Sequence, residues 1–108
     1  MNQEVKTKWI QALRSGKYKQ GQAYLRQGDS YCCLGVLCDL NESRQWTPID
    51  HSFKKIYSPF PDDEHQLLPK NISQWADLIE IEQEELVELN DTEEYTFEQI
   101  ADYIEENL

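Results

Sequence analysis

The residues best suited to chemistry are the cations near the start of the chain. Residues 5–28 contain six Lys or Arg residues and no Asp or Glu. Cationic and amide side chains bind phosphate groups, and aromatic rings stack on nucleobases. This segment, with a tryptophan that follows it, therefore predicts a binding site for a small phosphate-bearing ligand. The expected ligand-binding residues are Arg14, Lys17, Tyr18, Lys19, Gln20, Tyr24, Arg26 and Trp46.

The groups in this predicted site have different roles. The four cations contact phosphates, Tyr18 or Tyr24 stacks on a base, and Gln20 contacts a sugar or a base edge. Trp46 is a further candidate for stacking because it lies in an irregular, aromatic-rich segment. The alternative is a solvated loop whose lysines neutralise the acidic half of the same chain.

The net charge of −11 is distributed unevenly, and this distribution narrows the class of ligand. Residues 1–60 have a net charge of +4, whereas residues 61–108 have a net charge of −15. A long nucleic acid binds through many phosphates, so the acidic half would repel it. The charge map therefore favours a nucleotide or dinucleotide over a nucleic-acid polymer. A second hypothesis makes the acidic half the working surface, which binds a basic host protein or imitates DNA.

Thiol and imidazole groups offer the next possible chemistry. Cys32, Cys33 and Cys38 lie in one apolar run, and their spacing matches no common zinc site even with His51 and His65 included. An apolar setting also opposes thiolate formation. We therefore predict no metal, no cofactor and no cysteine nucleophile, but buried, reduced cysteines in a reducing compartment. A histidine general base would be needed for a third hypothesis, a small nucleotide-cleaving enzyme.

Asp39 is an acid within an apolar stretch. Such a residue is either at a helix surface or buried with a partner, and Arg14 or Arg26 is the expected partner. A structural ion pair is favoured over catalysis. Other paired carboxylates are expected to form a solvated face, so no catalytic residue is predicted.

The first half of the chain contains the elements that must position these groups. Apolar residues at helical spacing predict a helix over residues 2–15, which Gly16 ends. Residues 17–30 predict a hairpin or irregular loop, with a short strand at 24–25 and a turn at 27–30. Residues 31–40 predict either a strand that runs into a buried helix or a buried helix alone. We favour a helix over about residues 32–42, where Gly35 allows another element to approach closely.

The second half is less regular at its start and helical towards its end. Residues 52–57 and 65–68 are expected strands, joined by a turn at 59–63. Asn71 is the expected cap of a helix, which residues 84–89 either extend or follow as a second helix.

The last helix has the clearest start signal. Thr96 with Gln99 forms a capping box before an apolar stripe. Residues 1–108 thus predict one α+β domain, mostly helical, with a small antiparallel sheet. Residues 1–8 are polar and no apolar run is long enough for a membrane span, so we expect a cytoplasmic protein with no membrane contact.

Two long motifs resemble a known group of proteins. The first comprises Trp9, LRSGKYKQG at residues 13–21, Leu25-Arg26 and YCCLGVLCDL at residues 31–40. The second comprises LND at residues 89–91 and FEQIADYI at residues 97–104. Together they resemble a family of small, mostly uncharacterised phage and prophage proteins. The resemblance implies a phage accessory protein in the host bacterial cytoplasm, without implying a chemistry.

These observations lead to one functional hypothesis. We expect a counter-defence protein that captures a small nucleotide immune signal, a cyclic nucleotide or an ADP-ribose derivative, without turnover. Capture without turnover needs no catalytic constellation, and a pocket formed between subunits makes a homo-oligomer an expectation. The acidic inhibitor or DNA mimic of a host defence protein is the alternative, and the nucleotide-cleaving enzyme ranks last.

Overall fold

The computed structural model describes residues 1–49, 55–60 and 67–108. In these ranges the chain forms five helices and five short strands, which confirms the expected α+β class. The helices are α1 (Gln3–Arg14), α2 (Cys33–Leu40), α3 (Lys70–Ala76), α4 (Glu80–Asp91) and α5 (Phe97–Asn107). The strands are β1 (Lys19–Gln20), β2 (Arg26–Gln27), β3 (Ser30–Tyr31), β4 (Thr47–Pro48) and β5 (Ile56–Ser58).

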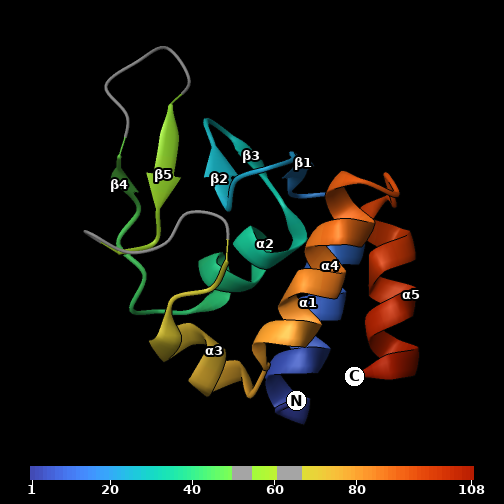
Figure 1. Cartoon of the computed structure of the whole chain (residues 1–108). Helices are drawn as coiled ribbons and strands as arrows, with labels where there is room; N and C mark the ends of the chain where they lie inside the picture. The colour runs from blue at the N-terminus through green and yellow to red at the C-terminus, as the bar shows by residue number, and fades with distance from the viewer. Residues whose placement is uncertain (50–54, 61–66) are drawn as a thin grey trace.

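Helix α2 lies at the centre of the molecule. Helices α1 and α4 both pack against it, and α5 packs against α1 and α4 (Figure 1). Every residue from Cys33 to Cys38 is buried, which explains why this run is apolar all round. The Trp9 indole donates from Nε1 to the carbonyl oxygen of Cys33 (2.9 Å) and so attaches α1 to α2.

The first and last helices both begin at a side-chain cap, and the cap of the last one was predicted. Asn2 Oδ1 accepts hydrogen bonds from the backbone N–H groups of Glu4 and Val5. Thr96 and Gln99 form the expected reciprocal capping box, with distances of 2.9 and 3.2 Å. Both contacts use N–H groups that have no partner within the helix, so they stabilise the helix starts.

The middle helices differ in detail from the prediction. The predicted cap at Asn71 is wrong, because α3 already begins at Lys70, directly after Pro69. Proline has the backbone angle that a helix start requires, which moves the start upstream. Asp77 then adopts a left-handed conformation (φ 55°) and ends α3. Residues 84–89 therefore belong to a second helix, α4.

The sheet has the strand order β1-β3-β2-β5-β4. Strands β2 and β3 form an antiparallel hairpin across Gly28, which has a positive φ of 58° and confirms the expected turn. The strand expected at residues 24–25 begins two residues later, at Arg26. Strand β1 pairs with β3 in parallel, because the chain reverses direction twice between them. The sheet is therefore mixed, not purely antiparallel.

The strands predicted in the second half are only partly described. Strand β5 overlaps the end of the segment expected at 52–57, and residues 50–54 lie outside the described part. Residues 67 and 68 do not form the strand expected at 65–68. Residues 61–66, with most of the turn expected at 59–63, are also outside the described residues. Strand β4 was not predicted, because two residues give no measurable alternation.

The three cysteines are free and buried, as predicted. Burial raises the pKa of the Cys32 thiol to about 12 and raises the pKa values of the Cys33 and Cys38 thiols well above their ordinary value. They are packing residues of the core around α2. In residues 1–49, 55–60 and 67–108, no helix has both the length and the apolar character needed to cross a bilayer.

Candidate functional site

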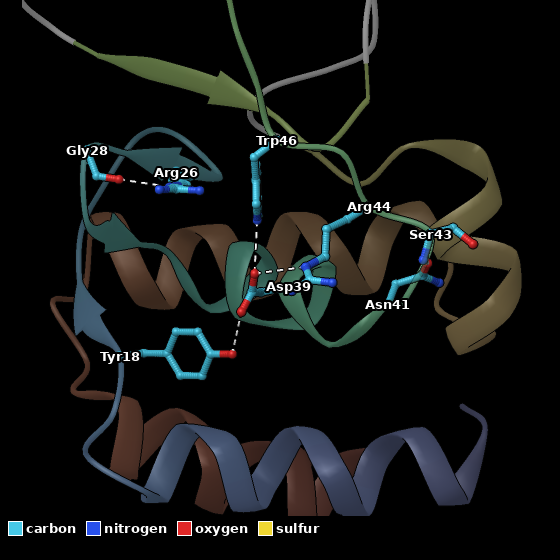
Figure 2. Close-up of polar contacts among 8 residues, drawn as sticks. All are labelled: Tyr18, Arg26, Gly28, Asp39, Asn41, Ser43, Arg44 and Trp46. Atoms are coloured by element: carbon cyan, nitrogen blue, oxygen red, sulfur yellow. Dashed lines mark hydrogen bonds and ion pairs between the residues drawn. The ribbon is translucent and has the colours of Figure 1, made fainter.

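Asp39 is the centre of a polar cluster at the C-terminal end of α2. Its carboxylate accepts from the Tyr18 hydroxyl (2.6 Å), from Trp46 Nε1 (2.9 Å) and from Arg44 Nε (3.0 Å). Figure 2 shows Tyr18 reaching this carboxylate from one side, and Arg44 and Trp46 from the other. We call these four residues the Asp39 cluster. Its three donors come from the loop after α1 and from the segment between α2 and β4.

The electrostatics of the cluster keep the carboxylate ionised. Partial burial by itself would raise the pKa of Asp39, but the hydrogen bonds from Tyr18, Trp46 and Arg44 outweigh burial and lower that pKa. Burial, followed by the hydrogen bond to Asp39, raises the pKa of Tyr18. At neutral pH the hydroxyl is therefore a proton donor to a charged acceptor, and its bond to Asp39 is charge-assisted.

The expected ion-pair partner of Asp39 was wrong. Arg44 forms the pair, whereas Arg14 binds Asp102 (2.7 Å) and Glu105 (2.8 Å) on α5. The local chain geometry explains this choice. Just after α2, Asn41 Oδ1 accepts from the backbone N–H of Ser43 (2.9 Å), and this turn brings Arg44 back towards the helix end (Figure 2).

Arg26 is surrounded by aromatic rings. On the central strand β2 it is directly opposite Tyr31 of β3 and Tyr57 of β5. Its guanidinium carbon lies 5.4 and 4.5 Å from the centres of those two rings, and 5.5 Å from that of Trp46. Its Nε donates to the Gly28 carbonyl oxygen (2.8 Å). The strand register thus places a cation among three rings.

Tyr18 also lines a groove between α1 and the end of α2. The groove has a volume of about 400 Å³, and Lys8, Ser15, Lys17 and Leu40 are among its other lining residues. The Tyr18 ring packs edge-on against Tyr31, with 5.2 Å between ring centres. Its hydroxyl is bound to Asp39, so the ring is fixed at both ends. Two lysines, a hydroxyl group and a fixed ring therefore share one concave surface.

The predicted site residues do not all converge. Lys17 and Tyr18 share the groove, and Tyr18, Arg26 and Trp46 gather around Tyr31 and Asp39. The remaining four lie elsewhere in the structure. Arg14 faces α5, Lys19 is exposed on β1, Gln20 contacts α4, and Tyr24 is half-buried before β2.

One known protein family matches the whole of the sequence. The match is to the family described as a domain of unknown function (DUF8296), and it covers residues 1–108. The chain belongs to this family. No curated protein and no solved structure matches it.

In this DUF8296 chain the sequence interpretation missed a buried polar centre. Asn90 on α4 is 1 % exposed, and its Oδ1 accepts from Gln20 Nε2 (3.0 Å) and the Cys33 backbone N–H (3.3 Å). Its Nδ2 donates to the Gly21 carbonyl oxygen (2.9 Å). Gln20 Nε2 also donates to Tyr95 O (2.7 Å), so its amide holds β1 to α4. The spacing of four from the buried Leu86 was the available signal.

Metal ligation and histidine chemistry have no geometric basis in the described part of this DUF8296 chain. Among those residues, no group of three or more His, Cys, Asp or Glu side chains is arranged to hold a metal ion. His51 and His65 lie outside the described residues. Of the eight predicted site residues, Lys17, Tyr18 and Trp46 belong to the groove or to the Asp39 cluster.

Proposed function

We propose that this chain binds a small phosphate-bearing nucleotide in the groove lined by Lys8, Lys17 and Tyr18, and holds it without turnover. The observation that supports this proposal is the shared concave surface of two lysines and an aromatic ring. Ammonium groups attract phosphate, and a ring offers a stacking face for a base. A volume of about 400 Å³ lies within the range of small-ligand sites.

The lysines are available for a ligand at low cost. Lys17 is exposed, and Lys8 pairs with Glu4 at 3.8 Å while both side chains remain mostly exposed. Such an exposed pair contributes little to stability, so exchanging Glu4 for a phosphate is cheap. Asp39 has a positioning role in this proposal, because it holds the Tyr18 ring through the hydroxyl.

The biological role belongs to the same proposal. A phage accessory protein with this groove would remove a cyclic nucleotide or an ADP-ribose derivative from host signalling. The resemblance of the two long motifs supports the phage origin, and the charge distribution supports a small ligand over a polymer. Unchanged nucleotide recovered from the complex is the expected sign of capture without cleavage.

The test is calorimetric titration with cyclic dinucleotides, cyclic mononucleotides and ADP-ribose. Lys8→Ala/Lys17→Ala should weaken binding at least tenfold. The matched control is Lys6→Ala/Lys19→Ala, which removes the same charge from outside the groove. A ligand at a hundred times its Kd should also stabilise the wild-type fold by roughly 2.7 kcal/mol. Equal loss in both double variants, or no binding of any of these nucleotides, would rule out the groove as the site.

A further inference from the structure

Two isoleucines at the start of α4 face solvent. Ile79 is 59 % exposed and Ile81 is 63 % exposed. In the described part of the chain, Ile49 is the other large apolar side chain with this status, at 37 %. Folding thus leaves two large apolar side chains uncovered within three residues.

Ile79 also occupies a position for which isoleucine is poorly suited. It is the N-cap of α4, where Ser, Thr, Asp and Asn are favoured because their side chains accept a backbone hydrogen bond. Among the residues that the structure describes, the side-chain cap contact here is in the reverse direction, from the Ile79 N–H to Glu82 Oε1 (3.1 Å). Within the described chain the isoleucine thus supplies neither a cap nor a buried side chain. Proteins depart from local preferences of this kind at functional sites.

A groove of about 530 Å³ has Ile79, but not Ile81, in its lining. Leu67, Leu68, Leu78 and Ile79 provide its apolar lining, and Asp77 and Glu80 are among its polar residues. The buried Gln83 fixes the floor, because Oε1 accepts from the Leu68 N–H (3.0 Å) and Nε2 donates to the Leu78 carbonyl oxygen (3.1 Å). We call the groove with Ile79 and Ile81 the α4 docking surface.

The acidic residues around the α4 docking surface favour a positively charged partner. Residues 71–108 contain thirteen Asp or Glu and no Lys or Arg. Ile81 is three and four residues before Glu84 and Glu85, which are its neighbours on the helix face. Lys70, which also lines the groove, is the one Lys or Arg in residues 61–108, so acids outnumber it around the groove. Two copies that paired through this same surface would bring like charges together, which disfavours a symmetric dimer here.

We propose that the α4 docking surface binds a cationic amphipathic segment of a partner protein. Apolar side chains of that segment enter the groove beside Ile79, and its Lys or Arg residues face the surrounding carboxylates. Amphipathic helices of partner proteins commonly bind in this way, with the apolar face in an apolar groove. It is independent of the nucleotide site, because none of its residues lines the Lys8–Lys17 groove.

The test uses a dye-labelled synthetic peptide of about 16 residues, with Leu at helical spacing and Lys elsewhere. Fluorescence anisotropy should show binding to the wild-type chain that weakens with added salt. A matched peptide with Glu in place of Lys should not bind. Ile79→Thr/Ile81→Gln leaves every charge in place and should weaken binding of the Lys peptide at least tenfold. Ile49→Gln is the control and should change it less than twofold.

Three outcomes would overturn the proposal. The first is no binding of the Lys peptide to the wild-type chain. The second is equal binding to the wild type and Ile79→Thr/Ile81→Gln, since that would reduce the interaction to net charge. The third is a wild-type dimer in sedimentation that Ile79→Thr/Ile81→Gln converts to monomer, because the occupant would then be a second copy.

Discussion

Gly35 of α2 lies against the backbone carbonyl of Leu25, the residue before β2. A Cβ atom at position 35 would overlap Leu25 O, with the Leu25 carbonyl carbon and Cα also close. The glycine therefore allows α2 and the sheet to approach at backbone distance. Arg26 follows directly and takes its place among the aromatic rings, so this contact sets the position of the Asp39 cluster relative to the sheet.

Gly35→Ala should destabilise the protein by about 3 kcal/mol, because backbone atoms cannot move aside as a flexible side chain can. Alanine in a helix ordinarily stabilises by about 0.5–1 kcal/mol relative to glycine, so the sign of the change tests the packing argument. The measurement is the free energy of unfolding in guanidinium chloride. A stabilised variant would contradict the close contact.

Asp39→Asn should lower stability at pH 7 by about 2–3 kcal/mol, because it weakens three hydrogen bonds to a charged acceptor. The folded protein has a lowered Asp39 pKa. The stabilisation is thus fully present above the unfolded value of about 3.9 and disappears as the pH falls through the folded pKa. Urea titrations should show that the difference from wild type shrinks between pH 7 and pH 3.

The matched control for this prediction is Asp102→Asn. Asp102 also binds an arginine, but its side chain is 61 % exposed. An exposed pair contributes about 0–1 kcal/mol, so this variant should differ little from wild type at pH 7. A difference for Asp39→Asn that stays constant from pH 7 to pH 3 would show that the carboxylate charge is not what stabilises the cluster.

The cysteines should be unreactive in the folded protein. All three are buried and have raised pKa values, so thiolate is scarce and access is blocked. Iodoacetamide at pH 8 should modify none of them until the protein is unfolded in urea, after which mass spectrometry should show three additions. Partial labelling of the folded chain would mean that α2 opens locally.

The raised pKa values of the three thiols also predict how stability changes at alkaline pH. A group whose folded pKa is raised stabilises the fold fully below its unfolded pKa, and this contribution is lost as the pH rises. For thiols the loss begins near pH 8.5. Unfolding free energies should therefore fall between pH 8 and pH 10. Cys38→Ala should reduce the slope, and an unchanged slope would exclude that thiol as its cause.

The elements predicted correctly have local signals. Asn2 and Thr96 cap α1 and α5 within three residues, and each helix has one apolar stripe, so the sequence alone reveals them. The parallel pair β1–β3 joins residues eleven apart through two-residue strands. Strands this short show no alternation, and their pairing depends on tertiary contacts that periodicity does not encode.

The site was predicted in part for similar reasons. Lys17 and Tyr18 were identified from charge and ring type and do share a groove. The partner of Asp39 was sought among the cations of residues 5–28, but Asn41 turns the chain so that Arg44 lies nearer. Gln20 was identified as a ligand contact because an amide suits a sugar edge, whereas Asn90 binds it from α4. Such pairings depend on folding and not on spacing.

Ile79→Thr should stabilise the protein by about 1 kcal/mol, since threonine is a good N-cap and isoleucine a poor one. Glu82 already accepts from the backbone N–H of residue 79, so the threonine hydroxyl completes a reciprocal capping box. Urea unfolding measures the gain, with Ile49→Thr as a control that has no helix to cap. If Ile79→Thr instead lost stability, the isoleucine side chain would have a role within the fold. Its exposure would then need no partner protein to explain it.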